Sequence, residues 1–124
     1  MTSERQLAEF RGWALAVLDL LGAHPDRQVA FLQASKVDSD EILLQFDDLV
    51  HVAHARVRDG SLNHEDFRLI KAVDESVSAV SEGPELIWAV AALEEATEWR
   101  ELRTAARMAK SSLERSWGQE YGDS

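Results

Sequence analysis

The sequence predicts an all-α fold, a single-domain bundle of five or six helices with short connections. Apolar residues recur at intervals of three and four along most of the chain, which is the spacing of one face of a helix. Capping residues, glycines and prolines interrupt this pattern, and no segment resembles a convincing strand. A chain of 124 residues is long enough for one core, so residues 1–124 are expected to form one helical domain.

The first helix is predicted from about Glu4 to Leu21. Ser3 and Gln6 have the spacing of a capping box at its start, and Gly22 is expected to end it. Its apolar face consists of Leu7, Phe10, Ala14, Val17 and Leu21.

Residues 27–35 fit either a short helix or a strand. Pro25 disfavours helical geometry at His24, and Asp26 is then in position to cap a short element. We predict a helix, because no partner strand is visible elsewhere in the chain.

Two helices are predicted in the central part of the chain. A capping box that begins at Asp38 starts the first of them, which ends near Gly60. Its apolar face consists of Ile42, Phe46, Leu49, Ala53 and Val57. Asn63 can cap the second, which has Asp66 in its first turn and ends at Gly83. Its apolar stripe consists of Leu69, Ile70, Val73, Val77 and Val80.

The C-terminal third predicts two further helical faces. Pro84 suits a first helical position, and the face that follows it consists of Leu86, Val90 and Leu93. The other face consists of Trp99, Leu102, Ala106, Ala109, Leu113 and Trp117. One continuous helix over residues 84–117 would be about 50 Å long, so we expect a break or kink near residues 96–98. Residues 117–124 are expected to form a frayed C-terminal tail.

The chain is strongly acidic. Thirteen basic and 23 acidic side chains give a net charge of −10, which favours a basic partner and repels nucleic acid and anionic lipid. The absence of cysteine excludes thiolate metal sites and thiol chemistry. No uncharged apolar run could span a bilayer, and the N-terminus does not resemble a signal peptide, so we expect a cytoplasmic protein with no membrane contact.

The stretch DDLVHVAH, residues 47–54, is the nearest approach to a chemical motif. On a helix, Asp47, His51 and His54 share one side with Arg58, whereas Asp48 points away. This side borders the apolar face, where a solvated acid–histidine pair is expected. Because the permanent charge of Arg58 opposes a bound cation, we expect the two histidines to hold no metal tightly.

A metal site would need acids from another helix, and Glu94, Glu95 and Glu98 are the candidates. They spell EEATE, which is similar to the EExxE motif of the all-α nucleotide pyrophosphatases, with Asp47 and Asp48 as the second acidic set. The two sets occur here in the reverse chain order. The resemblance implies a magnesium-dependent hydrolase of phosphoanhydrides. The metal ligands of this alternative are Asp47, His51, Glu94, Glu95 and Glu98.

The last helix is basic along one side. Arg100, Arg103, Arg107 and Lys110 project beside Trp99 and Trp117, and such a stripe could receive phosphates or stacked bases. Nucleic-acid binding is therefore a further alternative. The simpler interpretation is intramolecular, with the stripe near acidic faces of neighbouring helices.

The leading prediction is a small acidic non-enzymatic protein–protein interaction domain, an adaptor or an immunity-like inhibitor that binds a basic partner. Asp47 and Asp48 lie too far along their helix to cap it, so we predict that they contact the partner. Trp117 precedes Gly118 and the tail, so it is expected to be partly exposed and to anchor the interface. No cofactor is expected, and homo-oligomer formation is left open.

Overall fold

The computed structural model describes residues 4–122, and the side chains of residues 4–118. It confirms the all-α prediction, because the described residues form six α-helices and one 3-10 helix and contain no strand. In chain order the elements are α1 (Glu4–Leu21), α2 (Pro25–Ser35), α3 (Asp40–Arg58), α4 (His64–Ser81), η1 (Glu85–Trp88), α5 (Val90–Glu95) and α6 (Thr97–Gly122).

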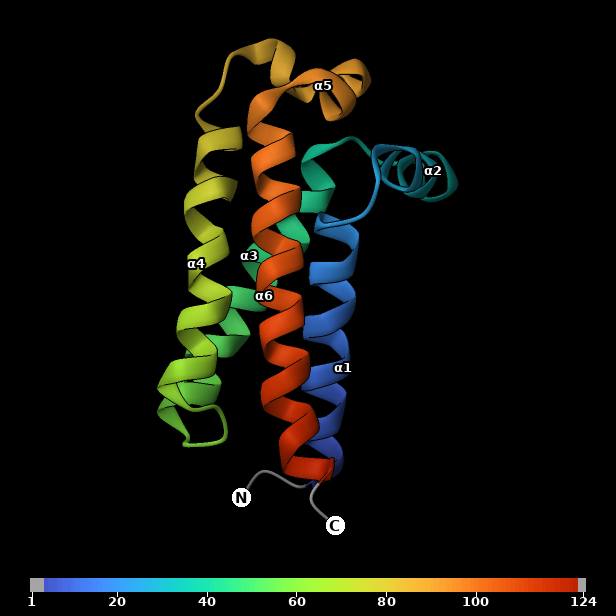
Figure 1. Ribbon diagram of the computed structural model, residues 1–124. Coiled ribbons are helices and arrows are strands. Elements are labelled where there is room, and N and C mark those ends of the chain that lie inside the picture. Colours follow the sequence, from blue (N-terminus) through green and yellow to red (C-terminus); the bar gives the residue numbers. More distant parts are fainter. Residues whose placement is uncertain (1–3, 123–124) are drawn as a thin grey trace.

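The four long helices form an antiparallel bundle. Helix α6 packs against α1 and α4, and α3 packs against the same two helices from the other side. Neighbours in this ring run in opposite directions, whereas α2, η1 and α5 lie at the end of the bundle where α1 and α4 finish (Figure 1). One end of the core is therefore covered by the two connecting segments, one between α1 and α3 and the other between α4 and α6.

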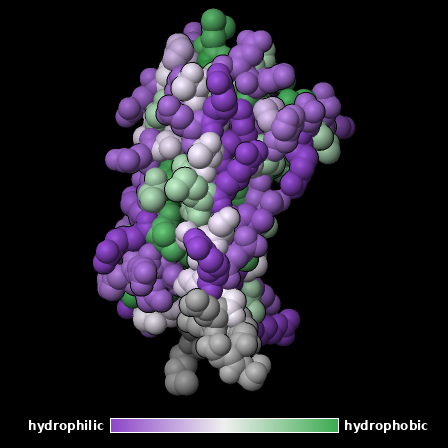
Figure 2. All heavy atoms as spheres, in the orientation of Figure 1, coloured by the Kyte–Doolittle hydropathy of each residue, from purple (hydrophilic) through white to green (hydrophobic). Residues whose placement is uncertain are grey.

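Most residues of the apolar faces predicted for the four long helices are buried in the core. Trp99 is the largest fully buried side chain, and its Nε1 donates a hydrogen bond to the Ile87 carbonyl at 2.8 Å. A buried indole needs such a partner, because an unpaired N–H in an apolar environment costs about 1–3 kcal/mol. Hydrophilic side chains cover most of the face seen in Figure 2, with hydrophobic residues confined to small patches.

Two of the predicted helix caps differ from the structure. His24, not Asp26, caps α2, because its Nδ1 accepts a hydrogen bond from the Asp26 amide at 3.2 Å. The capping box at Asp38 is wrong as well: Ser39 is the residue before α3 and makes no side-chain cap. The Ser39 hydroxyl instead donates to the Trp88 carbonyl at 2.6 Å, which ties the start of α3 to η1.

Other helix boundaries agree with the sequence. Asn63 Oδ1 accepts from the Asp66 amide at 2.7 Å, so the predicted cap of α4 is confirmed. Gly60, just after α3, has φ +84°, a conformation that residues with a Cβ rarely adopt. The cap expected from Ser3 lies outside the described residues.

After Pro84, the segment between α4 and α6 breaks at Ala89 and again at Ala96, and the sequence predicts only the break at Ala96. Leu86 and Val90 are 80% and 55% exposed, so the apolar face assigned to them is wrong, whereas Leu93 is buried as expected. The reason is Ala89, whose extended backbone at ψ 146° ends η1 and resets the helical phase. The predicted break near residues 96–98 is confirmed, because Ala96 is extended at ψ 133° between α5 and α6.

The C-terminal helix continues further than the sequence suggests. Helix α6 extends to Gly122, so it includes most of the segment expected to be a frayed tail, while residues 123–124 lie outside the described part. None of the helices described combines the length and the apolar character that a membrane span needs.

Candidate functional site

The DDLVHVAH stretch lies on α3, and one side of it borders α4. The His54 ring packs on the Phe67 ring of α4, with centroids 4.6 Å apart and an interplanar angle of 57°. One imidazole face is therefore used in packing between the two helices. Asp47, Asp48, His51 and His54 are all exposed, as expected for a solvated border of the core.

Asp47 is close to a second carboxylate that the sequence analysis did not connect with it. Partial burial raises the pKa of Asp47, and the charges of Asp74 on α4 and of adjacent Asp48 raise it further. Lys71 Nζ pairs with Asp74 at 2.9 Å. Among the residues described, no salt bridge joins Asp47 or Asp48 to a basic side chain.

These acids extend into a small surface shared by the two helices. On α4, Asp74 and the exposed Glu75 line a shallow polar depression together with Lys71 and Glu82. We name Asp47, Asp48, Asp74 and Glu75 the acidic surface. Within it, Asp47 and Asp74 interact across the packing of α3 against α4, and the charges of Asp74 and Asp48 disfavour ionisation of Asp47 in the free domain.

The pKa of Asp47 leads to a stability prediction. Because the pKa of Asp47 is higher in the folded than in the unfolded state, its ionisation lowers the stability of the fold. This destabilisation is absent below the unfolded pKa and appears as the pH rises through the folded pKa. Asp47→Asn is therefore expected to raise the free energy of unfolding at pH 7 by a few tenths of a kcal/mol, since solvent screens this exposed group. Urea unfolding of both proteins at pH 7 and at about pH 3 measures this gain in the free energy of unfolding, which should vanish at the lower pH.

Asp59 is a matched control for that prediction. Hydrogen bonds from Ser61 lower the pKa of Asp59, so its ionised form is favoured by the fold. Asp59→Asn should consequently give no gain in stability at pH 7. A gain for both variants would mean that the reduction in net charge, and not the position of Asp47, is responsible.

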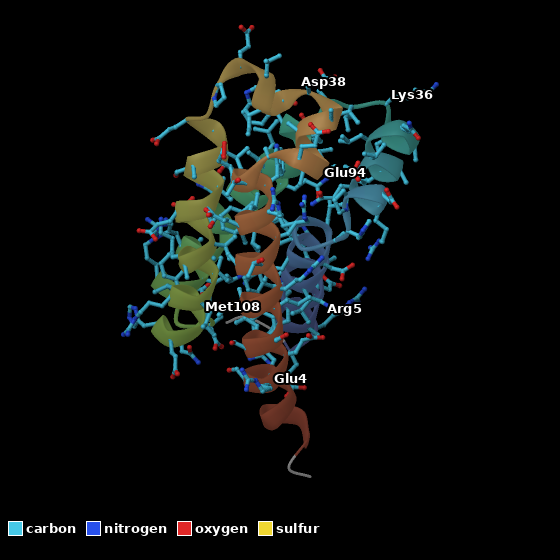
Figure 3. All side chains as sticks on the ribbon, turned by 45° about the horizontal axis from the view of Figure 1, so that its top comes forward. Glu4, Arg5, Lys36, Asp38, Glu94 and Met108 are labelled. Atoms are coloured by element: carbon cyan, nitrogen blue, oxygen red, sulfur yellow. The ribbon has the colours of Figure 1, made fainter. Side chains whose placement is uncertain are left out.

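The acids of the metal-binding alternative are not brought together. Glu94 and Glu95 are exposed on α5, which packs on α6, α2 and η1 at the end of the bundle, where Figure 3 labels Glu94. Asp47 instead has Asp74 of α4 as its charged neighbour. Across residues 4–118, no three histidine, aspartate or glutamate side chains are grouped as metal ligands would be.

Three arginines of α6 bind the ends of other helices. Arg103 Nη1 donates to the Leu93 carbonyl in α5 at 2.5 Å, and Arg107 Nε donates to the Gly22 carbonyl after α1 at 2.5 Å. Arg100 makes the same kind of bond to the last residue of α5, Glu95. Carbonyls at a helix C-terminus are unpaired and carry partial negative charge, so cations are favourable there. The basic stripe thus holds α1 and α5 against α6.

Gln28 and Arg103 form a buried polar centre that the sequence analysis missed, in which Arg103 Nη1 donates to Gln28 Oε1 at 3.4 Å. Gln28 is fully buried on α2, and its Nε2 donates to the Leu20 and Leu21 carbonyls at the end of α1. Burial lowers the pKa of Arg103, and the neighbouring positive charges lower it further. The only signal in the sequence was the position of Gln28, four residues before buried Leu32 and therefore on the same face.

Trp117 occupies the core and not the surface. It is 3% exposed, so the expectation of partial exposure is wrong. Its Nε1 donates to Asp66 Oδ2 at 2.8 Å, and the Arg11 guanidinium lies 5.3 Å from its ring centroid. Helix α6 continues beyond this residue and α4 supplies the buried acceptor, so Trp117 offers no free face to a partner.

Comparisons with protein-family models, with curated proteins and with solved structures found no match to this chain.

Proposed function

We propose that this chain is a small non-enzymatic protein-binding domain, an adaptor or an inhibitor, whose acidic surface contacts a basic protein. The observation that carries the proposal is that Asp47 and Asp48 are exposed and form no salt bridge among the described residues, while the charge of Asp74 on α4 helps to raise the pKa of Asp47. Such an arrangement costs the free domain stability, and a cationic partner removes that cost. The acidic surface offers negative charge, so lysine or arginine side chains on the partner fit it best.

The overall charge supports the same proposal. A net charge of −10 attracts a basic protein over a distance of about 8–10 Å at physiological salt, and so speeds encounter. The two alternatives gain no comparable support. The acids of the hydrolase alternative lie on separate parts of the bundle, and the arginines of the nucleic-acid alternative are hydrogen-bonded to helix ends.

Capture from the native host tests the proposal. Wild-type protein and the Asp47→Asn/Asp48→Asn variant serve as baits, with mass spectrometry of the bound proteins. Glu94→Gln/Glu95→Gln is the matched control, because it removes two exposed acids from α5 and changes the net charge equally. We expect basic proteins captured by the wild type and by the control but not by the variant. Identical captures by all three baits contradict the proposal.

The kinetics of the captured partner give a second readout. Charges at an interface mainly affect the association rate. Asp47→Asn/Asp48→Asn is therefore expected to slow association several-fold at low salt, and added salt should slow the wild type more than the variant. Stopped-flow or surface-binding measurements at two salt concentrations check this. Equal association rates at low salt would make the acidic surface a solvated face without a binding role.

A further inference from the structure

A second surface lies between α4 and α6, on the side of α4 that faces away from α3. A shallow apolar groove of about 230 Å³ separates α4 from α6, and its lining residues are Leu69, Ala72, Ala105, Met108, Ala109 and Ser112. Met108 has an apolar and flexible side chain, yet it is 67% exposed and not covered by the rest of the domain. Figure 2 shows hydrophobic residues gathered between α4 and α6 on this face, and Figure 3 labels Met108 on α6.

The charges beside this groove are arranged symmetrically about Met108. Glu101 lies seven residues before Met108 and Arg115 lies seven residues after it. Seven residues turn a helix by almost two full turns, so all three positions share one face, with the charges about 10.5 Å on either side of the methionine. Glu101 and Arg115 are both exposed, and neither forms an ion pair within the described part of the chain. Among the side chains described, residues 4–118, the Arg115 guanidinium donates a hydrogen bond only to the Ser112 hydroxyl, at 3.5 Å.

We infer that this groove binds a second copy of the same chain, with the two α6 helices antiparallel and crossing at Met108. A two-fold axis through that crossing places Glu101 of each copy opposite Arg115 of the other, which gives two identical ion pairs. Between the charges and the crossing point, α6 presents the small residues Ala105 and Ser112, which let two helices approach closely. The symmetric charges thus select a second copy over an unrelated apolar helix.

The expected association is weak. The face between the two charges is about 21 Å long along α6, which with α4 gives on the order of 500 Å² per copy, at the low end for specific interfaces. The net charge of −10 on each copy also opposes association. We therefore expect a dissociation constant on the order of 10 to 100 μM.

Sedimentation equilibrium across a concentration series tests the inference with reversed charges. Glu101→Arg and Arg115→Glu each place like charges opposite one another, so each variant should weaken dimerisation at least about tenfold. The double variant restores opposite charges at both contacts and is expected to lie within about threefold of the wild type. Both positions are exposed, so circular dichroism should show the same fold for all four proteins.

The two single variants separate a specific contact from a general charge effect. Glu101→Arg makes the net charge less negative, and Arg115→Glu makes it more negative. If net charge alone mattered, dimerisation would therefore be stronger for Glu101→Arg and weaker for Arg115→Glu. That result overturns the inference. So does a wild type that stays monomeric at about 0.5 mM, or a double variant that fails to recover association. None of these outcomes bears on the acidic surface, so the proposed function is tested separately.

Discussion

Replacing Val73 with aspartate is expected to unfold the domain. Val73 is 1% exposed in the middle of α4, on the same face as buried Ile70 and Val77. An ionised carboxylate placed there has no cationic partner, and its burial costs several kcal/mol beyond the lost contacts of the valine. A small domain has about 5–15 kcal/mol of stability in total, so most or all of it should be lost. Circular dichroism and thermal unfolding measure the effect.

Glu75→Ala is the control for this experiment. Glu75 is two residues further along α4 and is exposed on the opposite side of the helix. Its removal should change the free energy of unfolding by only about 0.5 kcal/mol. A similar loss for Glu75→Ala and Val73→Asp would mean that the rotation of α4 about its axis is wrong.

Asp66→Ala is expected to cost about 3 kcal/mol of stability, because charged hydrogen bonds contribute more than neutral ones. The buried Asp66 carboxylate accepts from Trp117 Nε1 at 2.8 Å and from the Ser116 hydroxyl at 2.9 Å, so it joins the start of α4 to α6. Without it, the buried indole N–H loses its acceptor. Equilibrium unfolding in urea gives the free energy. Replacing the exposed neighbour Glu65, in the same first turn, with alanine should lower the free energy of unfolding by less than about 1 kcal/mol.

A double variant identifies the cause of that loss. Phenylalanine at position 117 has no N–H, so it leaves no donor unpaired when Asp66 is removed. Asp66→Ala/Trp117→Phe is therefore expected to cost at least about 1 kcal/mol less than the sum of the two single changes. If the two losses simply add, the hydrogen bond between Asp66 and Trp117 is not what stabilises this end of the bundle.

The long helices were predictable because their signals are local. The predicted span of the first helix agrees with α1, Glu4–Leu21, and the Asn63 cap of α4 forms as expected. A capping side chain and a face repeated every three or four residues depend only on neighbours a few positions away. The helix predicted in residues 27–35 is confirmed for the related reason that no strand in the described residues pairs with it.

The sequence-based predictions fail where contacts between residues far apart in the sequence determine the local structure. Ser39 bonds to Trp88, 49 positions away, and Asp38 makes no cap. Leu86, Val90 and Leu93 have the spacing of one helical face. Leu86 is nevertheless exposed, because the extended backbone at Ala89 ends the 3-10 helix before Val90. Periodicity identifies an apolar face but does not say whether another helix will cover it.

The sequence by itself determined the all-α class, the four long helices, the break between α5 and α6 and the acidity of the chain, because periodicity, capping and charge are properties of short segments. Only the tertiary structure decided which polar groups meet. It placed Asp74 beside Asp47, buried Trp117 on Asp66, and used the α6 arginines to cap helix ends. Each of these contacts joins different helices, and the packing that aligns them follows from the burial of whole helix faces, which no local pattern specifies.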